Sequence, residues 1–179
     1  KGPLAASLES FRRYHHEAAW TWEHMALTRA RPIAGPPALC QTVCSVIREV
    51  LGMPRPPDKL RADVIEMREL MVSQHPAQGP WDLKYRRGGL IDIEFIHQFL
   101  LLKAAAAHPA LLDAPSPLDG FPALAKAGQL DPVWADQLAA SYGRFLRLQT
   151  WLRLTHDFFR GQSPTPTQLA GMSAALHPH

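Results

Sequence analysis

Apolar residues recur at three- and four-residue spacing along almost the whole chain, and no long segment alternates between apolar and polar positions. This pattern predicts an all-α fold, a helical bundle of about six helices. Three helices are expected first, over about 7–34, 38–51 and 58–73, with Asp58 as the cap of the third. The links between them are rich in glycine and proline, which end helices.

The first of these helices is predicted to turn one apolar side toward the core. That side carries Phe11, Tyr14, Ala18, Trp22, Met25 and Ala26. Cys40 and Cys44 lie four residues apart in the second helix, a spacing that indicates small core residues rather than a disulfide.

The helix predicted over 90–107 is apolar on nearly every side, which is typical of the central helix of a bundle. A short helix near 121–127 follows a proline-rich link. Asp131-Pro132 then predicts the start of a long helix near 132–159, with Trp134, Leu138 and Tyr142 in its apolar stripe. A last short helix is expected to begin at Thr165.

We expect two parts, the N-terminal helices of residues 1–80 and a helical bundle domain of residues 81–179. No apolar run reaches 18 residues and the N-terminus lacks a secretory signal, so we expect a cytoplasmic protein that does not span a membrane. The net charge is only +3 and the cations are scattered, which argues against nucleic-acid binding. The chain begins at Lys1 without a methionine, so we expect it to be part of a longer polypeptide.

The most informative segment is a cationic loop, Lys84-Tyr-Arg86-Arg87-Gly88-Gly89, that leads into the apolar helix. Free backbone N–H groups and the positive end of the helix dipole are expected at such a helix start. The three cations add charge at the same place, so the loop is predicted to bind an anion or an acidic partner.

Two carboxylates, Asp92 and Glu94, follow the loop, but they lie about 200° apart around a helix and are not expected to share one metal ion. Each is predicted to offset the helix dipole or to pair with Arg86 or Arg87, with a nucleotide or metal contact as the alternative. Glu94 and His97 form half of a di-iron motif, but no second copy is present, so His97 is predicted to be a hydrogen-bonded core residue.

The sequence contains no nucleophile elbow, P-loop, zinc spacing or dinucleotide fingerprint, so we assign no catalytic residue and no metal ligand. Trp22 and Glu23 in the first helix are followed by Arg29 and Arg31. Either the aromatic residues belong to the core and the arginines are solvated, or this cluster has a more specific role.

Three segments together resemble the glutamine synthetase adenylyltransferase family, in the order in which that family has them. They are Ala19 to Arg31 with Trp-Thr-Trp-Glu-His, Arg61 to Arg68, and Asp82 to Phe95 with Gly-Gly-Leu-Ile-Asp-Ile-Glu-Phe. The resemblance implies an enzyme with two related halves, each a nucleotidyltransferase domain followed by helices. One half transfers AMP from ATP to a tyrosine of glutamine synthetase, and the other removes it by phosphorolysis. The motif sequences of this chain are more similar to those of the adenylylating C-terminal half.

The resemblance also implies ATP and magnesium as cofactors of the intact enzyme. Its partners would be glutamine synthetase, the enzyme's own nucleotidyltransferase domain and a nitrogen regulatory signal protein. The family's metal-binding elements would precede Lys1, so we expect the chain to be inactive and to bind no cofactor on its own. The alternative is a non-catalytic helical module for protein–protein interaction.

Within the intact enzyme, charge and helix geometry suggest one set of contact residues, and the resemblance identifies a second set. The nucleotide or domain contact would comprise Lys84, Arg86, Arg87, Gly88, Gly89, Asp92 and Glu94, and the family-motif residues of the first helix are Trp22, Glu23, Arg29 and Arg31.

Overall fold

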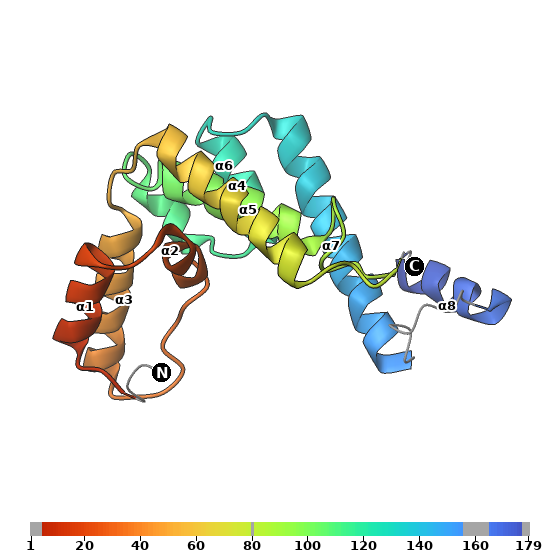
Figure 1. Ribbon diagram of the computed structural model, residues 1–179, viewed down its shortest axis with the longest axis horizontal. Helices are drawn as coiled ribbons and strands as arrows, with labels where there is room; N and C mark the ends of the chain where they lie inside the picture. Colours follow the sequence, from red (N-terminus) through yellow and green to blue (C-terminus); the bar gives the residue numbers. More distant parts are fainter. Residues whose placement is uncertain (1–4, 80, 156–164, 177–179) are drawn as a thin grey trace.

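The computed structural model describes residues 5–79, 81–155 and 165–176, and within them it contains eight α-helices, one 3₁₀ helix and no strand (Figure 1). The elements are α1 (Leu8–Glu17), α2 (Thr21–Leu27), α3 (Pro37–Leu51), α4 (Pro57–Gln74), α5 (Leu90–Ala104), η1 (Pro109–Asp113), α6 (Pro117–Lys126), α7 (Pro132–Thr155) and α8 (Pro166–Leu176). The prediction of an all-α bundle is confirmed. The predicted boundary between two parts near residue 80 stays a prediction.

The first predicted helix is instead two helices that meet at a corner. The Glu23 carboxylate holds this corner, because it accepts hydrogen bonds from the Trp20 backbone N–H at 2.8 Å and from the Tyr14 hydroxyl at 2.6 Å. Glu23 is the third residue of α2, the position from which a glutamate can reach back to the helix start. The apolar periodicity runs through the corner, which is why the sequence pattern alone predicts one helix.

The corner changes which side chains face the core. Met25 is buried as predicted and Phe11 is half-buried, but Tyr14, Ala18, Trp22 and Ala26 are exposed. The prediction of a single inward face is therefore wrong for these four residues. Leu27, which the sequence pattern did not single out, is buried instead.

Two later helices, α6 and α7, begin directly after a side chain that caps them. The Asp131 carboxylate accepts a hydrogen bond from the Val133 N–H at 2.8 Å, which confirms it as the cap of α7. Ser116 accepts from the Leu118 N–H, so α6 begins at Pro117, four residues before the predicted start. Asp58 lies in the first turn of α4 rather than at its cap.

The helix ends are less well predicted. The apolar helix ends at Ala104 rather than at residue 107, and the 3₁₀ helix η1 that follows was not predicted. Residues 156–159 of the predicted long helix lie outside the described residues. Trp134 is exposed, contrary to prediction, because the buried face of α7 begins at Ala135.

Helix α5 is central, as predicted, and packs against α2, α4, α6, α7 and η1 (Figure 1). Its side chains take part in two hydrophobic clusters: Leu102 packs with Val50 and Leu60 of the N-terminal helices, and Leu101 packs with Phe121 of α6 in the second. A third, smaller cluster joins Leu83, Leu148, Leu152 and Met172. Within the described part of the chain, no helix is long and apolar enough to cross a membrane.

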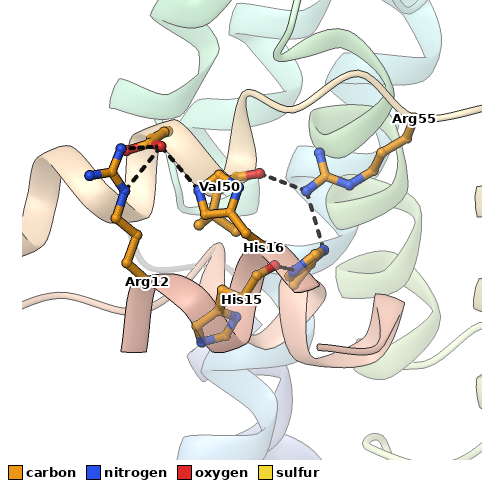
Figure 2. A network of polar contacts seen from close by, with 7 residues as sticks. Arg12, His15, His16, Val50 and Arg55 are labelled. Atoms are coloured by element: carbon orange, nitrogen blue, oxygen red, sulfur yellow. Dashed lines mark hydrogen bonds and ion pairs between the residues drawn. The ribbon is translucent and has the colours of Figure 1, made fainter. Parts of the chain in front are cut away.

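The C-terminal end of α3 is capped by the guanidinium group of Arg55 (Figure 2). This group donates to the carbonyls of Val50 at 2.8 Å and Leu51 at 2.9 Å, and it lies 3.3 Å from Nδ1 of His24. Because an arginine only donates, Nδ1 of His24 must be unprotonated, and its Nε2 donates to the His15 carbonyl at 3.0 Å. His24 is therefore neutral, and this chain of contacts ties α1, α2 and α3 together.

The two cysteines lie on α3 as free thiols. Cys40 is partly exposed and Cys44 is exposed, so the prediction that both are core residues is wrong. The α3 face toward the core carries Val46, Ile47 and Val50 instead.

His97 lies in the core between α5 and α6, 1% exposed, with its ring edge-on to Phe121. The two helices approach so closely that a Cβ atom on Gly120 would lie 1.9 Å from Nε2 of His97. Its location in the core is as predicted, but Nε2 has no hydrogen-bond partner within the described residues. Burial lowers the pKa of His97 to about 4.

We predict that replacing His97 with methionine makes the protein less sensitive to acid. In the unfolded chain the His97 pKa returns to about 6.5, so the unfolded state binds the extra proton first as the pH falls below that value. The resulting loss of stability between pH 7 and pH 4.5 should be roughly 2–3 kcal/mol smaller in His97→Met than in the wild type. Urea unfolding at several pH values measures this difference.

Other groups also contribute to acid sensitivity, since burial lowers the pKa of His15 and of His24 as well. They are present in both proteins and cancel in the comparison. An NMR titration in which the His97 ring protons shift near pH 6.5 would contradict the prediction.

Candidate functional site

The loop before α5 is organised by the buried carboxylate of Asp82. One oxygen accepts from the backbone N–H groups of Lys84 at 3.2 Å and Tyr85 at 3.1 Å, and the other accepts from Gln78 at 3.1 Å. Three N–H donors on one carboxylate fix the local backbone, because hydrogen bonds to a charged group are strong. The sequence analysis quoted Asp82 only as part of a motif and missed this role.

Both glycines of the loop are required by its geometry. Gly88 has φ of +73°, the left-handed region that favours glycine. A Cβ atom on Gly89 would lie 2.5 Å from the Leu83 carbonyl oxygen and 2.9 Å from that of Arg86. The Gly-Gly pair therefore allows the loop to fold tightly back onto the start of α5.

This tight loop uses the backbone N–H groups that were predicted to be free. The N–H of Gly89 donates to Arg86 at 3.0 Å, that of Leu90 to Leu83 at 2.8 Å, and that of Ile91 to Lys84 at 3.3 Å. The Gly88 N–H donates to Asp92. The backbone N–H groups of residues 88–91 are therefore not free, contrary to expectation. The anion contact of the cationic side chains stays a prediction.

Asp92 is anchored by Arg68 of α4 and not by the loop arginines proposed as its partners. The Arg68 Nε–H donates to one oxygen of Asp92, and Nη2 donates to the Tyr85 carbonyl at 3.0 Å. The side chains of Arg68 and Asp92 are only 15% and 24% exposed. This ion pair joins two of the segments that carry the family resemblance.

Glu94 points to a different neighbour. Its carboxylate lies 3.1 Å from Nη1 of Arg29, just beyond α2, and accepts a hydrogen bond from the Tyr142 hydroxyl of α7 at 2.9 Å. Burial and the Glu94 charge raise the pKa of Tyr142 to about 12. Arg29 is thus an ion-pair partner and not simply solvated, while Arg31 is exposed.

The two carboxylates thus contact different arginines, in keeping with their expected separation around the helix. Glu94 is directed at Arg29 and Tyr142, whereas His97 is enclosed between α5 and α6. Among the described residues, no three or more histidine, cysteine, aspartate or glutamate side chains form a group that could hold a metal ion.

One exposed cation of the loop, Lys84, lines a small cleft of about 370 Å³. Lys84, His75, Tyr85, Gln149 and Arg153 help to line it, so the cleft joins the loop to α7. The Lys84 ammonium group lies 4.8 Å from the centre of the Tyr85 ring, on which His75 stacks. Arg86 and Arg87 are exposed nearby in the sequence.

The charges of this cleft favour an anion. Lys84 and Arg153 are basic residues, and the only carboxylate among the described lining residues, Asp82, is already bound by three N–H groups. Arg153 was not singled out in the sequence, because it lies far from the loop along the chain and only the fold brings it near Lys84.

A larger cleft of about 890 Å³ lies between the α1–α2 corner and α4. Trp20 and Trp22 contribute to its lining and both are exposed. The tryptophans were assigned either to the core or to a specific role, and the structure excludes the core for both. The spacing Trp-x-Trp was the only sequence signal for this cleft.

Comparison with known proteins gives the same family as the motifs. A profile of the family described as glutamate-ammonia ligase adenylyltransferase matches residues 1–44. A protein of Xanthobacter autotrophicus, named bifunctional glutamine synthetase adenylyltransferase/adenylyl-removing enzyme, is 40% identical over 156 residues, which are 87% of this chain and 16% of the relative.

Proteins of the same name in two other organisms agree. The Brucella suis protein is 42% identical over 158 residues, 86% of this chain and 15% of the relative. The Mesorhizobium japonicum protein is 38% identical over 168 residues, 92% of this chain and 16% of the relative. The chain thus spans about one sixth of the length of these relatives, and the resemblance noted in its motifs is confirmed.

We predict that Asp92→Asn destabilises the protein by roughly 2–4 kcal/mol, because it leaves the largely buried Arg68 charge without a counter-ion. Hydrogen exchange of the backbone amides of residues 85–89 should accelerate at the same time. Chemical denaturation and exchange mass spectrometry measure the two effects.

The matched control is Glu49→Gln, which removes a surface carboxylate that pairs with Arg12 and contacts His16; the Arg12 and Glu49 side chains are 56% and 39% exposed. Its loss should stay below about 1 kcal/mol. Equal losses in the two variants would show that the Arg68–Asp92 pair is no more important than a surface pair.

Proposed function

Because the chain belongs to the glutamine synthetase adenylyltransferase family, we propose that it is a helical supporting region of an enzyme that transfers AMP from ATP to a tyrosine of glutamine synthetase. The main catalytic carboxylates and the magnesium ions they hold would lie in a nucleotidyltransferase domain outside this chain. We also propose that the enzyme is cytoplasmic and that its partners are glutamine synthetase and a nitrogen regulatory signal protein. The assignment to the adenylylating half rests on the amino-acid sequences of the motifs.

The main observation behind this proposal is that most carboxylates of the family motifs have partners within the chain. Four of them, Glu23, Asp82, Asp92 and Glu94, accept hydrogen bonds or pair with arginines within the chain, whereas Glu66 is exposed. Carboxylates engaged in this way hold helices together and are not free to bind a metal or to take up a proton. The motif residues therefore favour a scaffold over a complete active site.

We further propose that the cationic loop contacts an anionic group of the intact enzyme. Lys84 at the small cleft and the exposed Arg86 and Arg87 are the candidates, with Arg153 across the cleft. Phosphoryl-type transfer depends mainly on positioning and on neutralisation of negative charge, which fixed cations supply. The anion is either the ATP phosphates or an acidic surface of the nucleotidyltransferase domain.

A second candidate function is a non-catalytic interaction module, and the large cleft beside Trp20 and Trp22 favours it. The two functions are compatible, because a supporting region must contact both its catalytic domain and its protein substrate. A binding role alone would leave the similarity to adenylyltransferases unexplained.

We predict that the isolated chain does not adenylylate glutamine synthetase. Incubation with ATP labelled at the α-phosphate, Mg²⁺ and glutamine synthetase should give no labelled glutamine synthetase. The full-length Xanthobacter autotrophicus relative serves as the positive control. Labelling above background by the isolated chain would overturn the proposal that the catalytic groups lie elsewhere.

For the loop, the expected result concerns the full-length enzyme that contains this region. Lys84→Gln combined with Arg87→Gln should raise KM for ATP at least about tenfold if two charge-assisted contacts to phosphate are lost. The matched control is Lys126→Gln, which removes an exposed cation at the end of α6. Steady-state kinetics and ATP titration measure the effect.

An unchanged KM and rate would exclude the phosphate contact. A lowered melting temperature of the full-length enzyme with unchanged ATP affinity would then identify the domain surface as the anionic group. If neither property changed, the loop would have no anion-binding role and that part of the proposal would be wrong.

A further inference from the structure

The large cleft between the α1–α2 corner and α4 has two exposed tryptophans on one wall. The Trp20 side chain is 71% exposed and that of Trp22 is 47% exposed. Exposed indole groups are costly in water unless a partner covers them, and exposed apolar patches commonly mark interaction surfaces. The Trp20 backbone takes part in the α1–α2 corner, but neither indole side chain has a role in the contacts described above.

The other wall is one complete face of α4. Most of its lining residues recur at three- and four-residue spacing, and together they are Lys59, Asp63, Glu66, Met67, Glu69, Leu70 and Ser73. The core side of α4 is a different face, which carries Leu60 and Val64. From Lys59 to Ser73 the exposed face extends about 20 Å, the length of roughly four helical turns.

Charge indicates the kind of partner. Asp63 is already engaged by the Thr21 hydroxyl and by Lys59, whose Nζ is 2.7 Å away. Glu66 and Glu69 are exposed and have no ion-pair partner within the described part of the chain. The cleft therefore offers two carboxylates beside two indole rings, and both kinds of group attract cations.

We propose that this cleft binds a basic amphipathic helix of a partner protein. The apolar side of that helix would lie on Trp20, Trp22 and Leu70, and its arginine or lysine side chains would meet Glu66 and Glu69. A helix along a groove with periodic apolar contacts is an established mode of peptide recognition, and the acidic rim selects the charge. This site is distinct from the cationic loop, which selects the opposite charge.

The test uses a defined probe and the chain itself. The probe is a 16-residue capped peptide that is helical, with leucine on one side and arginine on the other, and its counterpart has glutamate in place of arginine. Isothermal titration should show binding of the arginine peptide and none of the glutamate peptide. The double variant Trp20→Ala with Trp22→Ala should lower affinity for the arginine peptide at least tenfold.

A second variant, Glu66→Gln with Glu69→Gln, should weaken binding by threefold or more and reduce its dependence on salt concentration. The control is Trp134→Ala, which removes a 60% exposed tryptophan of α7 that is not among the cleft-lining residues and should leave affinity unchanged. Circular dichroism spectra establish that each variant is folded.

Several outcomes would overturn the proposal. These are no binding of the arginine peptide, equal binding of both peptides, or binding that survives the double tryptophan substitution. Sedimentation that shows a dimer lost on the tryptophan substitutions would also overturn it, because the occupant would then be a second copy of this chain.

Discussion

The arrangement of the chain depends on the ion pair between Arg68 of α4 and Asp92 of α5. Both side chains are largely removed from water, so each charge carries a desolvation cost that the other must offset. The geometry provides more than one Coulombic contact, because Arg68 also donates to the Tyr85 carbonyl and Asp92 also accepts from the Gly88 N–H. The pair therefore holds α4, α5 and the loop between them at one point.

The same contacts explain why the loop before α5 has few free backbone N–H groups and yet exposes cationic side chains. Asp82 and Asp92 take up the backbone N–H groups from either end of the loop, and the glycines allow the backbone to come close enough. With these backbone donors used internally, the cationic side chains of the loop are exposed, and Lys84 lines the small cleft together with Arg153. The fixed backbone positions these cations before any ligand arrives, which lowers the entropic cost of binding an anion.

The sequence predicts those features that depend on local pattern. The apolar residues on all sides of α5 predict its central position, and Asp131 predicts the start of α7. Both predictions succeed because each depends on residues within or next to one helix. The corner between α1 and α2 could not be predicted in this way, because the apolar spacing continues through it. The hydrogen bond from the Trp20 backbone N–H to Glu23 marks the point where α2 begins.

The pairs that form the site were not predictable for a different reason. Arg29 and Glu94 are 65 residues apart, and Arg68 and Asp92 are 24 residues apart. Helical spacing rules apply to residues three or four apart, so they assigned Asp92 and Glu94 to the helix dipole or to nearby loop arginines. The family motifs contain all four residues, but a motif identifies the residues and not which of them meet.

Helix α4 connects the two charged regions of the molecule. Arg68, which anchors Asp92, lies between Met67 and Glu69, which line the tryptophan cleft on another face of the same helix. The two faces of α4 therefore serve different contacts, one toward the tryptophans at the start of α2 and one toward Asp92 of α5. The ion pair resists separation of α4 from α5 because separating it exposes two poorly solvated charges. Helix α4 thus carries both the acidic side of the large cleft and the arginine that anchors the cationic loop.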